Sequence, residues 1–448
     1  MAEGVLKSRK NKGNGLIKGA AWIAAGGFIA KIIGAIYRIP LTNLIGGKGL
    51  GLYQMVYPVY CLLLTVSATG IPSSIAKLTA ERIRKGQSTR PLFLSAMKLF
   101  LLIGIGGTAI MAIISPFLAK AQGSGEVLGG YYALAPSVFL VSAISVFRGY
   151  FQGKNDMMPT ALSEIAEQVI KVAFGILFAY LFKDRISLAV TFLLLAVSLS
   201  ELFTLFLMLA LYRREGEKRQ NDGGRVAFTA ILRMSIPVTV LSLLIPLSSL
   251  IDSVLATRLL SAYEQDAVTL YGLFSGGAVT IIGLPVSVCY GIAAATIPSV
   301  AAEPDGRKAR KKIFRSLGLT ALLGGVSALG LYAFADPAVR IIFRSLTGGE
   351  KQTLVRLVQV YSVSALTLSC AQTLAACLTA QGKPQHAALS MLVGVLVKTV
   401  SYYFWLKNPE ISVFGLAYAT NLCYLVAFLL DFMYNLIVTK KRIRKEKA

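Results

Sequence analysis

Charged side chains lie inside long apolar stretches of this sequence, where an ionisable group is costly and is usually retained for function. Residues 17–40 contain Lys31 and Arg38 but no Asp or Glu. Seven residues make almost two turns of an α-helix, so both cations lie on one helix face. Lysine and arginine are the usual partners of phosphate groups, so this pair predicts a site for an anionic ligand.

A second charged group lies in residues 159–182, where Glu164, Glu167 and Lys171 share one helix face at the spacing i, i+3 and i+7. Glu167 precedes Lys171 by four residues, the orientation that favours an ion pair within one helix. Either this stripe neutralises itself and holds the helix in place, or its charges take part in ligand binding. We therefore count Lys171 among the candidate binding residues, and Glu164 and Glu167 among the candidate counter-charges or ion sites.

Lys398 lies in a further apolar stretch, residues 385–406, that contains no carboxylate. Its ammonium therefore needs a partner from another segment or contact with water, and it joins the candidate binding residues. Asp252, in residues 230–256, is a candidate counter-charge or ion site. Because no local carboxylate depends on Lys398 or on Lys31, we expect their neutralisation to impair ligand handling and to leave folding nearly unchanged.

Twelve mostly apolar segments position these side chains, and each is long enough to cross a hydrocarbon core, which takes about 20 residues of helix. Hydrophobic residues make up 55% of the chain and charged residues 15%. Backbone groups in lipid must be satisfied within the segment, so the segments are expected to be helices. The sequence predicts an all-α, polytopic membrane protein with spans at 17–40, 52–78, 92–114, 130–150, 159–182, 187–212, 230–256, 267–298, 314–335, 354–380, 385–406 and 412–438.

The loops between these segments alternate in charge, and one set carries about three times as many Lys and Arg as the other. Cytoplasmic loops carry this excess, so both termini are expected on the cytoplasmic side of a bacterial membrane. The net charge of +25 lies mostly along these loops, which favours contact with anionic lipids over nucleic-acid binding. The basic set comprises the N-terminus, the loops near 79–91, 151–158, 213–229, 299–316 and 381–384, and the tail after Val438.

The chain also contains an internal repeat. Gln-Gly-Lys opens both 152–171 and 381–398, Ala-Leu-Ser follows in each, and a lysine stands eight residues after each serine, at Lys171 and Lys398. An even number of helices per copy makes the two copies parallel. We therefore expect two pseudo-symmetric six-helix lobes, 1–222 and 223–448, around a central cleft. Two such lobes are suited to transport by alternating access.

Metal, nucleotide and catalytic sites are not indicated by the sequence. All five cysteines lie in apolar segments without the paired spacing of a metal site, and the chain has one histidine. No glycine-rich loop carries the lysine and hydroxyl of a nucleotide site. We therefore expect no cofactor, no bound metal and no enzyme activity. We also expect the protein to be a monomer.

Two stretches resemble a known family. Residues 37–81 and the motif FRGYFQGKNDMMPTALSEIAEQV at 147–169 are similar to the polysaccharide exporters, especially their stage V sporulation protein B and lipid II flippase branches. The resemblance covers essentially the whole chain. It implies a two-lobed flippase that moves a lipid-linked sugar of the undecaprenyl-pyrophosphate class to the outer leaflet. It also implies that Lys31 and Arg38 line the cavity, as basic residues of the first helix do in lipid II flippases.

Two alternatives remain open beside a flippase for an anionic lipid-linked oligosaccharide or peptidoglycan precursor. Members of the resembled branch commonly have two more helices, which form part of a groove for the lipid tail, whereas cation-coupled multidrug exporters of the same superfamily usually have twelve. Such exporters rely on a carboxylate in the N-terminal lobe, yet the first helix here is basic. A polyprenyl-phosphate glycosyltransferase usually needs an acidic residue in the first external loop, and residues 42–51 contain none.

Overall fold

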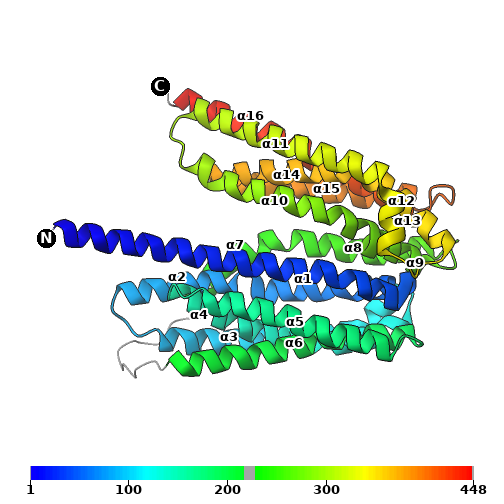
Figure 1. Ribbon diagram of the computed structural model, residues 1–448, viewed down its shortest axis with the longest axis horizontal. Coiled ribbons are helices and arrows are strands. Elements are labelled where there is room, and N and C mark those ends of the chain that lie inside the picture. The colour runs from blue at the N-terminus through cyan, green and yellow to red at the C-terminus, as the bar shows by residue number, and fades with distance from the viewer. Residues whose placement is uncertain (1, 216–227, 446–448) are drawn as a thin grey trace. The chain divides into compact units, whose positions relative to one another are not determined.

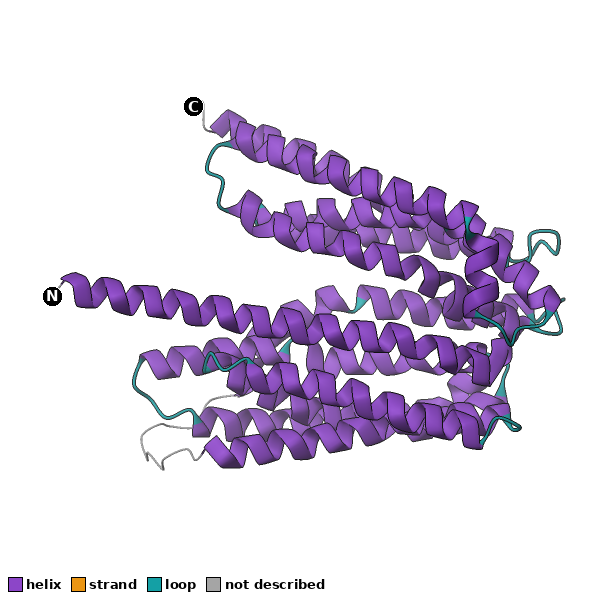
Figure 2. Ribbon diagram, viewed as in Figure 1, coloured by secondary structure: helices purple, strands orange, loops and turns teal. Residues whose placement is uncertain are grey.

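The computed structural model describes residues 2–215 and 228–445, and for several of them, Lys31 included, it describes the backbone alone. The described residues form helices joined by short loops and include no strand (Figure 2). The predicted all-α fold is therefore confirmed. A helix satisfies backbone N–H and C=O groups within its own segment, which is why a chain of this composition folds as helices in lipid.

The first two predicted segments form one long helix with a break. Helix α1 spans Ala2–Leu64 (Figure 1), and at Gly46 its backbone turns to φ 65° and ψ −170°. Glycine adopts this conformation without a steric penalty because it has no Cβ. The loop predicted near 41–51 is thus reduced to a break. A π-helical turn, η1 (Thr65–Thr69), and α2 (Ile71–Arg84) complete the second segment.

The next four predicted segments each form a single helix, and a short 3-10 turn, η2 (Gly125–Val127), precedes the second of them. The seventh segment is divided between two helices, so its predicted continuity is wrong in detail. The helices of this part of the chain are α3 (Arg90–Ala121), α4 (Leu128–Gly153), α5 (Met158–Leu181), α6 (Ile186–Glu215), α7 (Phe228–Ser242) and α8 (Leu244–Leu260).

The remaining five predicted segments are also helical. The eighth consists of α9 (Ala267–Gly272), a π-helical turn η3 (Leu273–Ala278) and α10 (Val279–Ala301). The short α12 (Ala335–Ile342) lies in a predicted loop. The other helices are α11 (Gly306–Ala333), α13 (Gly348–Tyr361), α14 (Val363–Ala380), α15 (Pro384–Trp405) and α16 (Phe414–Lys445).

Nine helices among the described residues are long and apolar enough to cross a membrane. Helix α5 falls outside this group because every stretch of sufficient length contains Glu164, Glu167 and Lys171. Helices α7 and α8 fall outside it because each is short by itself. The charged stripe of α5 thus lies in a helix that its neighbours must accommodate.

The chain divides into two compact units. The first comprises residues 1–45, 56–120 and 124–247, and the second comprises 46–55, 121–123 and 248–448. The first unit therefore includes α7, which the sequence assigned to the C-terminal lobe. The lobe boundary at residues 222 and 223 remains a prediction about how the chain moves.

In the first unit, α6 packs against α4 and α5, and α4 also packs against α2. Gly149 of α4 makes the last contact possible, because a Cβ there would lie 2.8 Å from the Pro72 carbonyl oxygen and 2.9 Å from Ile75 Cβ. An aromatic cluster lies beside this contact, with the rings of Phe93 and Tyr212 stacked 4.4 Å apart. In lipid the hydrophobic effect does not drive helices together, so small residues that allow close van der Waals packing stabilise such contacts.

Polar side chains link the helices of the second unit. Thr320 of α11 and Thr373 of α14 share a hydrogen bond of 3.0 Å, and Asn435 of α16 donates to the Leu374 carbonyl of α14 at 3.0 Å. Outside the spans, Asp305 caps α11 by accepting from the backbone N–H groups of Arg307 and Lys308. These two hydrogen bonds stabilise the carboxylate and lower the pKa of Asp305.

Candidate functional site

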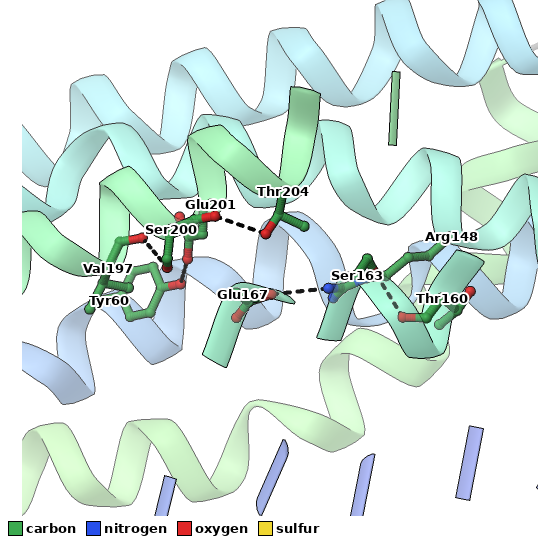
Figure 3. Close-up of polar contacts among 9 residues, drawn as sticks. All are labelled: Tyr60, Arg148, Thr160, Ser163, Glu167, Val197, Ser200, Glu201 and Thr204. Atoms are coloured by element: carbon green, nitrogen blue, oxygen red, sulfur yellow. Dashed lines mark hydrogen bonds and ion pairs between the residues drawn. The ribbon is translucent and has the colours of Figure 1, made fainter. Parts of the chain in front are cut away.

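Arg148 and Glu167 form an ion pair inside the first unit, between α4 and α5. Arg148 Nη2 lies 3.0 Å from Glu167 Oε2, and Arg148 Nε donates to Ser163 Oγ at 2.9 Å (Figure 3). Ser163 in turn donates to the Thr160 carbonyl at 2.7 Å. The two charged side chains are 15% and 20% exposed, so the pair is well shielded. These contacts hold the Arg148 guanidinium of α4 in one orientation against α5.

This pair corrects a prediction from the sequence. The spacing of Glu167 and Lys171 favoured an ion pair within α5, but the Glu167 carboxylate is taken by Arg148 of the neighbouring helix. Arg148 is the one charged residue of the segment 130–150. A lone arginine in a membrane span was the signal that could have identified it.

Glu201 of α6 and Tyr60 of α1 form a second buried contact. The Tyr60 hydroxyl donates to Glu201 Oε1 at 2.5 Å, and Glu201 is 1% exposed (Figure 3). The other carboxyl oxygen, Oε2, is buried and has no hydrogen-bond partner among the described residues. The hydroxyls of Ser200 and Thr204 donate to backbone carbonyls of α6 and not to this oxygen.

Lys171 interacts with the carboxylates of both contacts. It is half-buried on α5 and interacts electrostatically with Glu167, Glu201 and Arg38. Within the described part of the chain its ammonium makes no hydrogen bond, and no carboxylate oxygen lies within the ion-pair distance of 4.0 Å. Lys171 is thus a cation inside a span without a direct partner there.

The other candidates of the first unit are described less fully. Arg38 of α1 and Glu164 of α5 are both partly buried. Lys31 lies in α1, but its side chain is outside the described residues, so its predicted role stays a prediction.

In the second unit, Lys398 is buried beside polar side chains. Its Nζ lies 2.7 Å from Asp252 Oδ2 and 2.6 Å from Ser248 Oγ, both on α8 (Figure 1 labels the helix). The Lys398 side chain is 5% exposed, and the Tyr402 ring lies 5.7 Å from its ammonium. Of the two outcomes left open by the sequence, a partner from another segment is therefore the one observed. Asp252 is its counter-charge.

No group of three or more His, Cys, Asp and Glu side chains that could hold a metal ion occurs among the residues that the structure describes. The cysteines are free thiols, and four of the five are buried. The functional groups described in the spans are thus charged and hydrogen-bonding side chains.

Comparisons with known proteins agree on a family and a fold. Residues 16–302 match the polysaccharide biosynthesis protein family. Stage V sporulation protein B of Bacillus subtilis (strain 168) is 26% identical over 420 residues, which cover 90% of this chain and 80% of that protein. Lipid II flippase MurJ of the same organism is 23% identical over 452 residues, covering 93% and 82%.

Two solved structures share the fold. An inward-facing multidrug resistance transporter of the MATE family, in the MOP superfamily, superposes with a TM-score of 0.77 at 15% identity over 94% of this chain and 96% of that chain. Lipid II flippase MurJ in an inward closed conformation superposes with a TM-score of 0.74 at 13% identity over 94% and 89%. The chain is therefore a multi-pass membrane protein with the fold of these transporters.

Proposed function

Because the chain belongs to the polysaccharide biosynthesis protein family, we propose that it is a flippase for an anionic lipid-linked oligosaccharide or peptidoglycan precursor. Its relatives include a lipid II flippase, which supports a substrate of the undecaprenyl-pyrophosphate class. The fold by itself does not choose the substrate, because a multidrug transporter and a lipid II flippase both superpose well. The choice rests on the charges inside the spans.

Lys171 is the observation that carries the proposal. Glu167 is neutralised by Arg148, and Lys171 is left without an ion-pair partner among the described side chains. An unpaired ammonium inside a span is costly, and a phosphate or pyrophosphate group supplies the missing counter-charge. Lys31 and Arg38 of the first helix are proposed as further contacts, with Glu164 and Glu167 as balancing charges.

Lys398 is proposed to act differently from Lys171. Its ammonium already has Asp252 and Ser248 as close partners. It would bind an anionic headgroup only after release from α8, so we propose that it contributes in a later conformation of the cycle. Cytoplasmic termini, lobes at 1–222 and 223–448 that alternate in access, and a monomeric state complete the proposal.

A second candidate function is a cation-coupled multidrug exporter. The buried carboxyl of Glu201, which has one oxygen without a partner in the described structure, is the observation that favours it. Lys171, the cation that interacts with Glu201, argues against a cationic substrate, because like charges brought together inside a membrane repel strongly.

Substrate binding by purified protein in lipid nanodiscs tests the proposal. Undecaprenyl-pyrophosphate glycolipid is expected to bind, to bind more weakly as salt rises, and to lose about tenfold in affinity in Lys171→Gln. Glu167 keeps Arg148 as its partner in this variant, so the fold should survive. The matched control is Lys183→Gln, which removes an exposed lysine beyond the end of α5. Export of ethidium without glycolipid binding would establish the multidrug exporter instead.

A further inference from the structure

The carboxyl of Glu201 is a titratable group that substrate binding alone does not explain. It is 1% exposed, and the Tyr60 hydroxyl donates a hydrogen bond to its Oε1. An ionised carboxylate buried without a counter-charge costs several kcal/mol, whereas the protonated form avoids that cost. Its state of protonation therefore depends on which cation stands nearby.

The groups that face Glu201 come from three helices. Helix α1 contributes Tyr60, α5 contributes Glu167 and Lys171, and α4 contributes the uncharged Ser137. Glu167 is a like charge and already has Arg148 as its partner. Of these groups, Lys171 is therefore the one that can balance an ionised Glu201.

The Lys171 ammonium can pair with either of two groups, the Glu201 carboxylate or an anionic headgroup. If it lies beside Glu201, the carboxylate is balanced and can remain ionised. If an anionic headgroup binds the ammonium, Glu201 loses its counter-charge and its ionised form becomes too costly to maintain. In the described geometry, Lys171 lies beyond ion-pair distance of Glu201 and Glu201 Oε2 is unpartnered, so no cation pairs directly with this carboxyl.

We propose that binding of an anionic headgroup at Lys171 is coupled to uptake of one proton at Glu201. The proton comes from water and converts the carboxylate to a carboxylic acid, while Tyr60 continues to donate to Oε1. The substrate and a proton would then move through the cycle together, which offsets one of the negative charges carried by the headgroup. This inference rests on the proposed function, since it needs the anion at Lys171.

Proton linkage is tested by measuring the affinity for undecaprenyl pyrophosphate at several pH values, with the full-length protein in nanodiscs. Coupled uptake of one proton lowers affinity by at most about tenfold per unit rise in pH. The probe titrates as well, so the matched control is Glu201→Gln, which keeps an acceptor for Tyr60 but cannot ionise. We expect the affinity ratio of wild type to Glu201→Gln to fall as pH rises and to approach one at low pH.

A second measurement does not depend on the variant. Calorimetric titration of wild type in two buffers of different ionisation enthalpy counts the protons taken up on binding, and an uptake approaching one is expected at alkaline pH once the probe's own release is subtracted. No net uptake, or identical pH profiles for wild type and Glu201→Gln, would overturn the coupling while leaving the anion site intact. Undiminished binding by Lys171→Gln would instead overturn the anion site, and the coupling with it.

Discussion

Lys171 and Lys398 occupy matching places in the two copies of the repeat, yet their surroundings differ. Each stands eight residues after a serine, but Lys398 is paired with Asp252 whereas Lys171 has no ion-pair partner among the described side chains. A paired lysine contributes to packing, and an unpaired one stays available for a ligand. Of these two equivalent positions, only Lys171 is therefore proposed to bind the headgroup in the described conformation.

The Lys398–Asp252 pair leads to a prediction about stability. Lys398→Met would leave the half-buried Asp252 carboxylate without its ion-pair partner, a change expected to cost about 3 kcal/mol, near the lower end for a buried pair. The double variant Lys398→Met, Asp252→Asn removes both charges and should recover most of that loss. Thermal unfolding of the purified proteins in detergent measures both. The sequence predicts that neutralisation of Lys398 leaves folding nearly unchanged, whereas the ion pair with Asp252 predicts a loss of stability. Equal stability of Lys398→Met and wild type would contradict the prediction from the ion pair.

At the scale of elements, α5 shows how a helix with three charges can lie in a membrane protein. Arg148 comes from α4, so the charge of Glu167 is balanced across a helix contact and not along α5. The same α4 meets α2 through Gly149. Close approach of α4 thus supports both the packing of the unit and the polar contacts inside it.

This role of α4 can be tested at its glycine. Gly149→Ala should destabilise the protein by about 1–3 kcal/mol, because its Cβ would press on the Pro72 carbonyl and on Ile75. The matched control is Gly106→Ala in α3, where a Cβ meets open space and alanine improves helix propensity by about 1 kcal/mol. Thermal unfolding should therefore separate the two variants in opposite directions. Similar effects of both would mean that the α4–α2 contact is loose.

At the scale of the whole molecule, the basic loops predict the orientation of the fold in the membrane. Loops with excess Lys and Arg stay on the cytoplasmic side, because translocating them is costly. The proposed charge sites then have a defined order with respect to the inner and outer leaflets. The proposed flipping toward the outer leaflet depends on this orientation.

Single cysteines test the orientation. In a background lacking the five native cysteines, Gly125→Cys and Gly349→Cys should react with an impermeant thiol reagent added to intact cells. Gln87→Cys and Lys308→Cys should react only after the membrane is opened. All four positions are exposed, so accessibility differs by side of the membrane alone. The opposite labelling pattern would invert the topology and the direction proposed for transport.

The sequence by itself determined the helices and their order. Lipid leaves a backbone few ways to satisfy its hydrogen bonds, so an apolar run of about 20 residues is a strong signal of a helix. Ten of the twelve predicted segments are each one helix or consecutive helical turns, whereas the seventh breaks between α7 and α8 and the tenth between α13 and α14. The loop near 41–51 was wrong, because a single glycine at position 46 suffices to turn the chain.

Only the tertiary structure decided which charges meet. Helical periodicity places residues on a face of their own helix and says nothing of the helix opposite. Tyr60 and Glu201 are 141 residues apart, and Lys398 and Asp252 are 146 apart. The local spacing of Glu167 and Lys171 was therefore a weaker determinant than the arginine that α4 brings to α5, because the better-placed partner takes a carboxylate shielded from water.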